Sequence, residues 1–457
     1  MSMKPLSLET IARVTGGRYV GPDALRGTCI TGVVRDNRQV QPGNLFLCIR
    51  GARADGHSFA PAAYAAGAAC CLAEQPLDNA AGPYILVDST LRALRALAAH
   101  YRTLFRIPVV GVTGSVGKTG AKEMTAAVLS RRFNVLKTPE NLNNEIGVPL
   151  TVLSLQEEHQ AAVIEMGISD FGEMSRLADI VRPDICIMTN IGYCHLEALG
   201  DLEGVLRAKS EVFQFMKPDA TAVVCGDDEL LGTFDPGIRK ITFGLGRQNT
   251  VHAENVRNLG FEGIACDIVH GDSRISAHIP AFGSHMVLAA LAAAAVGLTL
   301  GLSDEEIIRG IADFQPVGGR ANVRRSGYIT VIDDCYNANP NSVSAALLSL
   351  AGIQGRRVAV LGDMLELGAN SDQLHRDVGV LVGKLGIDAL ICCGKSAEFI
   401  YKGLISTGIR IPAWHFPMKE ALLHTLPSLI RRDDTVLVKA SHGMHFEELV
   451  SALLELQ

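Results

Sequence analysis

Residues Gly111 to Thr119, with the sequence GVTGSVGKT, have the residue types and order of a phosphate-binding loop. Glycines such as Gly114 and Gly117 let backbone N–H groups close around phosphate oxygens, and the following helix N-terminus adds a favourable dipole. In such a loop we expect Lys118 to reach the β- and γ-phosphates and the Thr119 hydroxyl to bind Mg²⁺. The usual spacing requires glycine at position 112, where this chain has valine, with its glycine one residue earlier. The loop therefore predicts an ATP site in a slightly shifted register.

Three further polar residues lie in the region that follows this loop. Glu165 ends an apolar segment, and a carboxylate at the carboxyl end of a parallel strand can hold the metal on bound phosphates. His195 follows another apolar segment and is a candidate metal ligand or general base. Lys209 lies on a predicted helix over 206–215. Each also has a plainer interpretation, namely a solvated strand end, a hydrogen-bonded loop histidine and a surface lysine.

Four polar segments of the C-terminal third each come just after a predicted strand. They are Gly318-Gly-Arg320, Asp333-Asp-Cys-Tyr-Asn-Ala-Asn-Pro340, Gly362-Asp-Met-Leu-Glu-Leu-Gly368 and Lys439-Ala-Ser-His-Gly443. Because the carboxyl ends of parallel strands meet at one edge of a sheet, these segments should lie together. Their convergence favours a ligand site over four unrelated turns.

The pattern of apolar strands alternating with helices predicts an α/β protein of three domains. We expect a small α/β domain over 1–84, a central domain with the phosphate-binding loop and a mostly parallel sheet over 85–315, and a second, smaller doubly wound domain over 316–457. Predicted strands cover 109–112, 162–164, 185–188, 222–224, 329–332, 358–361, 389–392 and 436–438, and predicted helices cover 91–104, 121–129 and 286–299.

Composition restricts the class of protein. The chain has 457 residues, of which 48% are hydrophobic, with a net charge of −6 and no long basic run. This balance is ordinary for a globular protein and argues against a nucleic-acid partner. Eleven cysteines without zinc spacing suit a reducing compartment. The N-terminus is not a signal peptide, and the apolar run at 289–300 is too short to span a bilayer, so we expect a cytoplasmic protein without membrane contact.

Taken together, these motifs resemble the Mur ligase family, and the resemblance covers essentially the whole chain. The loop TGSVGKT has the family's glycine spacing, which accounts for Val112, and the segment Thr138–Pro149 is similar to the family's substrate-side loop. The segments DDCYNANP and GDMLELG are typical of the member that adds D-alanyl-D-alanine to UDP-N-acetylmuramoyl-tripeptide. The resemblance implies an ATP-dependent ligase of cytoplasmic peptidoglycan precursor synthesis, acting through an acyl phosphate. It also implies a UDP-sugar-binding first domain and a Rossmann-like last domain, and we expect a monomer.

The resemblance also implies residue roles. The catalytic residues would be Lys118, Glu165, His195 and Lys209. Two Mg²⁺ ions would be bound by Thr119, Glu165, His195 and Lys209, the lysine carrying a carbamate derived from CO₂. ATP would be held by Gly114, Ser115, Gly117, Lys118, Thr119, His285, Arg320 and Asp334. The other substrates would be held by Asp36, Asn37, Arg38, Asp55, His57, Asn141, Asn144, Tyr336, Asn337, Asn339, Asp363, Glu366 and Lys439. The chain departs from the family pattern at Asn37, Ala289 and His442, where we expect Ser, Asn and Arg.

Three alternatives are consistent with parts of this pattern. A sibling ligase that adds a diamino acid should carry the sequence Asp-Asn-Pro-Arg, which is absent here. A folylpolyglutamate synthase would have no use for a UDP-binding first domain. A GTP-binding switch shares the phosphate-binding loop, but it should carry Asn-Lys-x-Asp for guanine, and the chain has none.

Overall fold

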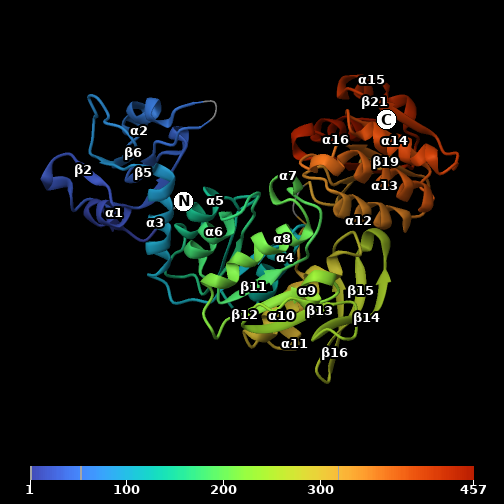
Figure 1. Cartoon of the computed structure of the whole chain (residues 1–457), viewed down its shortest axis with the longest axis horizontal. Coiled ribbons are helices and arrows are strands. Elements are labelled where there is room, and N and C mark those ends of the chain that lie inside the picture. Colours follow the sequence, from blue (N-terminus) through green and yellow to red (C-terminus); the bar gives the residue numbers. More distant parts are fainter. Residues whose placement is uncertain (1–2, 52–53, 317–318) are drawn as a thin grey trace.

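The computed structural model describes residues 3–51, 54–316 and 319–457, so Gly318 of the predicted third-domain motif lies outside the described residues. Three sheets follow one another along the long axis of the molecule, with the N-terminal and C-terminal sheets on opposite sides of the central one (Figure 1). The predicted mixed α/β fold with mostly parallel sheets is confirmed.

The N-terminal sheet has five strands in the order β2-β7-β6-β5-β4, and all its pairs except β2–β7 are parallel. Its strands are β2 (Arg18–Val20), β4 (Gly32–Val34), β5 (Asn44–Leu47), β6 (Cys70–Ala73) and β7 (Tyr84–Leu86). Two short strands, β1 (Leu6–Ser7) and β3 (Cys29–Ile30), form a separate antiparallel pair, and the helices are α1 (Leu8–Thr15) and α2 (Ala60–Ala65). The sheet extends to Leu86, past the predicted boundary at residue 84.

The central sheet has nine strands in the order β16-β15-β14-β13-β12-β11-β8-β10-β9. Its strands are β8 (Val109–Thr113), β9 (Val135–Lys137), β10 (Ala161–Glu165), β11 (Ile185–Met188), β12 (Thr221–Cys225), β13 (Arg239–Gly244), β14 (Val251–Asn258), β15 (Ile264–His270) and β16 (Ser273–Ile279). The strands from β9 to β14 pair in parallel, whereas β14, β15 and β16 form an antiparallel extension.

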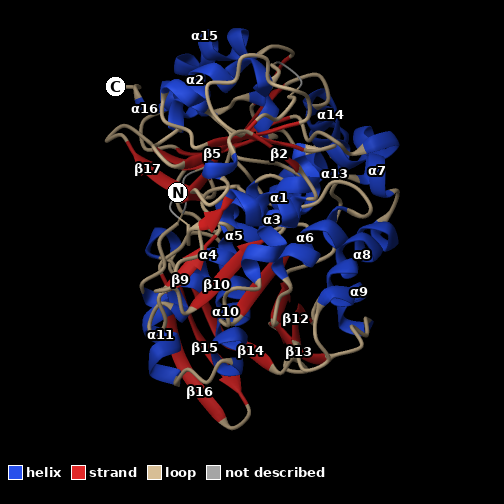
Figure 2. Ribbon diagram, turned by 90° about the vertical axis from the view of Figure 1, so that its left-hand side faces the viewer, coloured by secondary structure: helices blue, strands red, loops and turns tan. Residues whose placement is uncertain are grey.

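Helices cover the central sheet on both faces. They are α3 (Thr90–Arg102), α4 (Lys118–Leu129), α5 (Gly147–Val152), α6 (Glu173–Val181), α7 (Leu196–Leu199), α8 (Leu202–Ser210), α9 (Glu229–Thr233), α10 (Met286–Thr299) and α11 (Asp304–Ala312). Helices α4, α10 and α11 pack together, and α3, α5 and α6 form a second group (Figures 1 and 2). Helix α10 has the predicted bounds, whereas α3 ends at Arg102, before the predicted end. No helix in the described part of the chain is both long and apolar enough to cross a bilayer.

The C-terminal sheet has six strands in the order β17-β18-β22-β19-β20-β21, with only the β17–β18 pair antiparallel. Its strands are β17 (Asn322–Arg325), β18 (Thr330–Asp333), β19 (Arg357–Gly362), β20 (Ala389–Cys393), β21 (Ala413–Phe416) and β22 (Thr435–Lys439), and its helices are α12 (Pro340–Ala351), α13 (Ser371–Lys384), α14 (Ala397–Ser406), α15 (Lys419–Leu429) and α16 (Glu447–Leu454). Strands β18, β19 and β22 end at Asp333, Gly362 and Lys439, which brings three of the predicted polar segments to one edge.

Candidate active site

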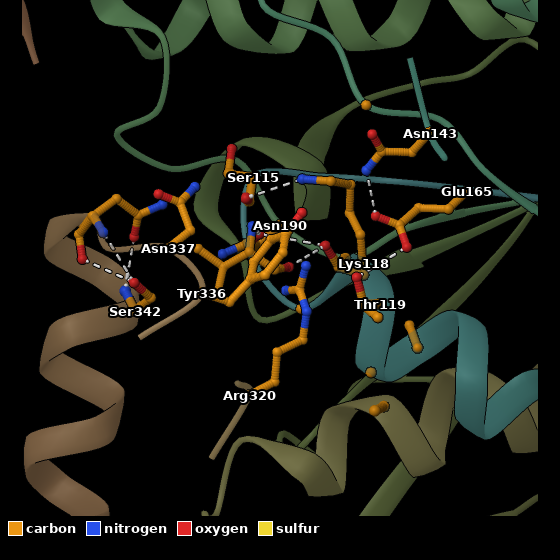
Figure 3. Close-up of a pocket in the computed structure, with 18 of the residues that line it drawn as sticks. Ser115, Lys118, Thr119, Asn143, Glu165, Asn190, Arg320, Tyr336, Asn337 and Ser342 are labelled. Carbon is orange, nitrogen blue, oxygen red and sulfur yellow. Dashed lines mark hydrogen bonds between the residues drawn. The ribbon is translucent and has the colours of Figure 1, made fainter. Parts of the chain in front are cut away.

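A cavity of about 860 Å³ lies between the central and C-terminal domains. The phosphate-binding loop and Glu165 line one side of it, and residues at the start of α12 line the other, with Arg320 and Tyr336 between them (Figure 3). Fourteen predicted site residues line this cavity: Ser115, Gly117, Lys118, Thr119, Asn144, Glu165, His195, His285, Arg320, Asp334, Tyr336, Asn337, Asn339 and Lys439. Residues far apart in the sequence thus meet at a single site.

The phosphate-binding loop joins β8 to α4 through two glycines in left-handed conformation. Gly114 has φ of +137°, and a Cβ there would lie 1.9 Å from the Thr189 hydroxyl, so no larger residue fits. Gly117 has φ of +81° and lies at the N-cap of α4, so that Lys118 begins the helix. The first N–H groups of a helix have no partner within it, and they provide an anion site beside Lys118.

Asn190, which follows β11, holds the middle of this loop. Its backbone oxygen accepts a hydrogen bond from Ser115 N at 3.0 Å, and its side-chain oxygen accepts one from Val116 N at 2.8 Å. Lys118 Nζ folds back to donate to Gly114 O at 2.9 Å. Burial lowers the pKa of Lys118, and the nearby Glu165 carboxylate partly offsets this effect. The loop therefore encloses the Lys118 ammonium group, which is positioned to bind a phosphate group.

Glu165 lies at the buried end of β10, where three side chains meet. Its Oε2 accepts a hydrogen bond from the Thr119 hydroxyl at 2.9 Å, and its Oε1 accepts one from Asn143 Nδ2 at 2.7 Å. Sequence reasoning selected Asn141 and Asn144 from the segment NLNNEIG but missed Asn143. Asn141 is exposed and outside the cavity lining, whereas the Asn144 side chain accepts from Ile146 N and Gly147 N just before and at the start of α5. The sequence alone does not show which of these three asparagine side chains points toward Glu165.

Charged residues line the cavity on the C-terminal side. The Arg320 guanidinium lies 4.0 Å from the centre of the Tyr336 ring, in cation–π contact. Lys439 Nζ donates to Asp334 Oδ2 at 2.7 Å and to Asn337 O at 2.9 Å. Asp334 Oδ1 also accepts from Ala321 N, which ties the segment after Arg320 to the end of β18. Two cationic side chains are thus held in fixed positions opposite the phosphate-binding loop.

Replacing Lys439 by methionine should destabilise the C-terminal domain. The Lys439 side chain is 3% exposed and the Asp334 side chain 17%, so the substitution leaves a largely buried carboxylate without its cation. We expect the free energy of unfolding to fall by about 3 kcal/mol. Urea denaturation would measure this loss. The control is Lys402→Met, which removes an exposed helical pair with Glu398 and should cost no more than about 0.5 kcal/mol; equal losses in the two variants would contradict the prediction.

His195 connects the central domain to the C-terminal domain. Its Nδ1 lies 2.6 Å from Glu366 Oε2, and both residues have positive φ, +51° and +63°. Burial lowers the pKa of His195, and the Glu366 carboxylate opposes this effect. Glu366 itself does not line the cavity, so its predicted contact with substrate would require movement of the loop that carries it.

Lys209 is buried at the end of α8, with 1% of its surface exposed. The plain interpretation of this lysine as a surface residue is therefore wrong. No hydrogen bond or ion pair joins Lys209 Nζ to any other residue of the described chain. Burial lowers its pKa to about 8, and the charge of Lys118 adds to the decrease. Burying a cation without a counter-charge costs free energy, so Lys209 Nζ loses its proton more readily than the amine of an exposed lysine.

The remaining predicted residues lie elsewhere. Asp36 pairs with Arg38 beside Asn37 at 2.6 Å, which lowers the pKa of Asp36 to about 2. Asp55 Oδ1 lies 2.5 Å from His57 Nδ1, and His57 Nε2 accepts from Glu74 N. These five described residues belong to the N-terminal domain and do not line the cavity.

Asp363 also lies apart from the cavity. Its carboxylate accepts hydrogen bonds from Lys395 N and Ala397 N, and the side chain is buried at the start of α14. Gly114 does not line the cavity, although its neighbour Ser115 does. His285 lines the cavity, but its Nδ1 is buried with no hydrogen-bond partner among the described residues, and burial lowers its pKa.

The donor set suits a hard cation rather than a transition metal. Within the described residues no group of three or more His, Cys, Asp and Glu side chains could hold a metal ion. Thr119 and Glu165 instead present adjacent oxygens beside a phosphate-binding loop, and Mg²⁺ is typically bound through one or two protein oxygens together with phosphates and water. These residues therefore fit Mg²⁺ delivered with a nucleotide.

Three protein-family models match consecutive parts of the chain. They are the Mur ligase family catalytic domain over residues 29–102, the Mur ligase middle domain over 112–297 and the Mur ligase glutamate ligase domain over 319–442. Full-length relatives named UDP-N-acetylmuramoyl-tripeptide–D-alanyl-D-alanine ligase are 36% identical, one from Bacillus subtilis with 98% of each chain covered and one from Escherichia coli with 99% of each covered.

Solved structures agree with these matches. MurF from Acinetobacter baumannii superposes with a TM-score of 0.92 at 32% identity, covering 100% of both chains. MurF ligase from Thermotoga maritima in complex with ADP superposes with a TM-score of 0.82 at 28% identity, covering 93% of this chain and 97% of that one. With relatives of this identity over its full length, the chain belongs to the Mur ligase family.

Proposed function

We propose that the chain is the ATP-dependent ligase that joins D-alanyl-D-alanine to UDP-N-acetylmuramoyl-tripeptide in peptidoglycan precursor synthesis, forming ADP and phosphate. One observation carries the proposal: the phosphate-binding loop and three of the four polar segments of the C-terminal domain line the same cavity. ATP bound at Lys118 would thus face groups from a second domain. The names of the full-length relatives supply the substrates, and the motifs DDCYNANP and GDMLELG agree with them.

The reaction has two steps. A carboxylate oxygen of the tripeptide attacks the γ-phosphorus of ATP, the bridging oxygen leaves with ADP, and an acyl phosphate forms. The amine of D-alanyl-D-alanine then attacks the acyl carbon, the C–O bond to phosphate breaks, and the amine loses a proton. The first step brings two anions together, so Lys118 and Arg320 lower its barrier by offsetting negative charge.

The first domain is proposed to hold the UDP part of the tripeptide substrate through Asp36–Arg38 and the Asp55–His57 pair. On the cavity side, Asn144 would contact the tripeptide. Tyr336, Asn337 and Asn339 lie at the start of α12, where they could contact the incoming dipeptide. The side-chain oxygens of both asparagines accept backbone hydrogen bonds, Asn339 from Ser342 N and Asn337 from Ala338 N, so each would contact the dipeptide through its amide NH₂ group.

Mg²⁺ is proposed to bind at Thr119 and Glu165, with His195 and a carbamylated Lys209 toward a second ion. Bound Mg²⁺ would neutralise charge on the phosphates. The buried, unpaired Nζ of Lys209 supports a carbamate, because CO₂ reacts with a neutral amine and converts it to an anion. His195 Nδ1 contacts Glu366, so Nε2 would be the atom that binds the second ion, with the Glu366 carboxylate orienting the ring.

We propose that the protein acts in the cytoplasm as a monomer. Its eleven cysteines are all free thiols and ten are buried, which agrees with a reducing compartment. ATP and the nucleotide-linked tripeptide are cytoplasmic metabolites of the proposed reaction.

Phosphate release should require both UDP-N-acetylmuramoyl-tripeptide and D-alanyl-D-alanine. The acyl phosphate forms only when a carboxylate is present, and phosphate leaves only after attack by the amine. The measurement is phosphate release together with product mass, using tripeptides that end in diaminopimelate or in lysine. Equal ATP hydrolysis with neither substrate present would refute the ligase, and a preference for GTP would indicate a different nucleotide site.

A further inference from the structure

Lys122 is fully buried on α4, one turn after Lys118, and no step of the proposed reaction uses it. Its ammonium group donates to Thr138 O at 2.8 Å and to Glu140 O at 3.1 Å, and it lies 2.9 Å from Glu123 Oε1. Lys122 thus donates two hydrogen bonds to backbone carbonyl groups and forms an ion pair with Glu123. This buried ammonium group ties the backbone of residues 138–140 to α4.

The fourth neighbour of this ammonium group is the candidate metal ligand Glu165. Lys122 Nζ lies 3.9 Å from Glu165 Oε2, which is too far for a hydrogen bond but close enough for a strong charge interaction in a buried site. The hydrogen bonds of Lys122 go to backbone carbonyl groups and not to the oxygens of Glu165. Those oxygens accept from Thr119 and Asn143.

The two carbonyl groups that Lys122 holds belong to the loop between β9 and α5, which carries Asn143. Thr138 Oγ1 accepts from Glu165 N at 2.9 Å, and Asn143 O accepts from Gly167 N at 2.8 Å, so the loop follows the end of β10. Glu140 has φ of +44°, a conformation that costs energy for a residue with a side chain, and the bond from Lys122 to its carbonyl helps to maintain it.

We propose that Lys122 is a positioning residue for ligation: by fixing the loop at 138–144 against α4, it sets the position of Asn143 and hence the direction of the Glu165 carboxylate. The inference rests on the proposed function. The same loop continues into Asn144 and Glu145, which line the cavity, so its position also affects the tripeptide site. The dipeptide contacts belong to the other side of the cavity and are independent of Lys122.

The test compares Lys122→Met with Asn143→Ser, using Lys137→Met as the matched control. Lys137 also pairs with Glu123, but its side chain is 49% exposed and it belongs to no catalytic or binding contact described above. We expect Lys122→Met and Asn143→Ser each to lower kcat by about 10–100-fold. The KM for UDP-tripeptide should rise by about 10-fold in both, with the KM for D-alanyl-D-alanine unchanged and with Lys137→Met like the wild type.

A merely structural role would lower the folded fraction, which reduces kcat and leaves every KM unchanged, and that result would overturn the proposal. If Lys122→Met does not fold, Asn143→Ser tests the proposal in its place. This substitution alters the contact between the loop and Glu165, and Asn143 is partly exposed. Wild-type KM for the tripeptide in Asn143→Ser would overturn the proposal. Failure of the wild-type enzyme to form the ligated product would instead refute the proposed function.

Discussion

Replacing Lys118 by methionine is expected to lower kcat for ATP-dependent ligation by about 10²–10³-fold. The substitution keeps the length and apolar stem of the side chain but removes the cation that begins α4. Lys118 Nζ donates to the carbonyl oxygens of its own loop, at 2.9 Å to Gly114 and 3.3 Å to Ser115. A γ-phosphate would offer a charged acceptor in place of these neutral ones, so the lysine should bind it more strongly as charge is transferred.

The matched control for this variant is Lys217→Met. Lys217 belongs to the same domain, but its side chain is 71% exposed and pairs with Asp184 away from the cavity. Product formation is measured for both variants at saturating tripeptide and dipeptide, together with binding of a non-hydrolysable ATP analogue. A Lys118→Met enzyme with wild-type kcat would show that the loop does not act on the γ-phosphate.

The positions of the site residues at the strand ends could be predicted from the sequence because two rules of parallel sheets apply. A buried parallel strand has a continuous apolar run, as in β8, β10 and β11, and its polar successor must lie at the carboxyl edge. This places Lys118, Glu165 and His195 on one edge. The same argument brings Asp334 and Lys439 together across β18 and β22.

The antiparallel extension of the central sheet was missed for the opposite reason. Strand β15, with the sequence IACDIVH, alternates between buried and half-buried residues, and β16 alternates between buried and exposed ones; both contain charged or polar residues that interrupt an apolar run. A search for continuous apolar segments does not find them. They add no residue to the cavity, so the error affected the fold more than the site.

Contacts that depend on tertiary packing could not be predicted. Asn143 and Lys122 are ordinary polar residues in the sequence, and only the position of the 138–144 loop brings them to Glu165. Lys209 shows the same limit more clearly. On a helix with charged neighbours it is expected at the surface, yet the packing of α8 buries it. From the sequence, only the family resemblance assigns Lys209 a role.

Removing CO₂ should inactivate the enzyme, and adding bicarbonate should restore it, if Lys209 is carbamylated. Burial lowers the pKa of Lys209 to about 8. Roughly a tenth of such a lysine is neutral at pH 7, against less than about a thousandth of an exposed lysine. The neutral fraction of the amine rises with pH and reaches one half at the pKa, so recovery at a fixed concentration of dissolved CO₂ should be faster at pH 8 than at pH 6.5. The measurement is ligation rate after treatment in CO₂-free buffer.

Lys209→Ala should lose activity by about 100-fold, because it removes the proposed ligand of the second Mg²⁺, and bicarbonate should not restore it. Labelling with ¹³C-bicarbonate gives an independent readout, since a carbamate carbon signal should appear in the wild type and be absent from Lys209→Ala. Lys217→Met serves again as the exposed-lysine control and should keep both the signal and the activity. A Lys209→Ala enzyme with full activity would show that the buried amine is only a packing element. Wild-type activity unaffected by CO₂ removal, with no carbamate signal, would show instead that Lys209 acts as a neutral amine.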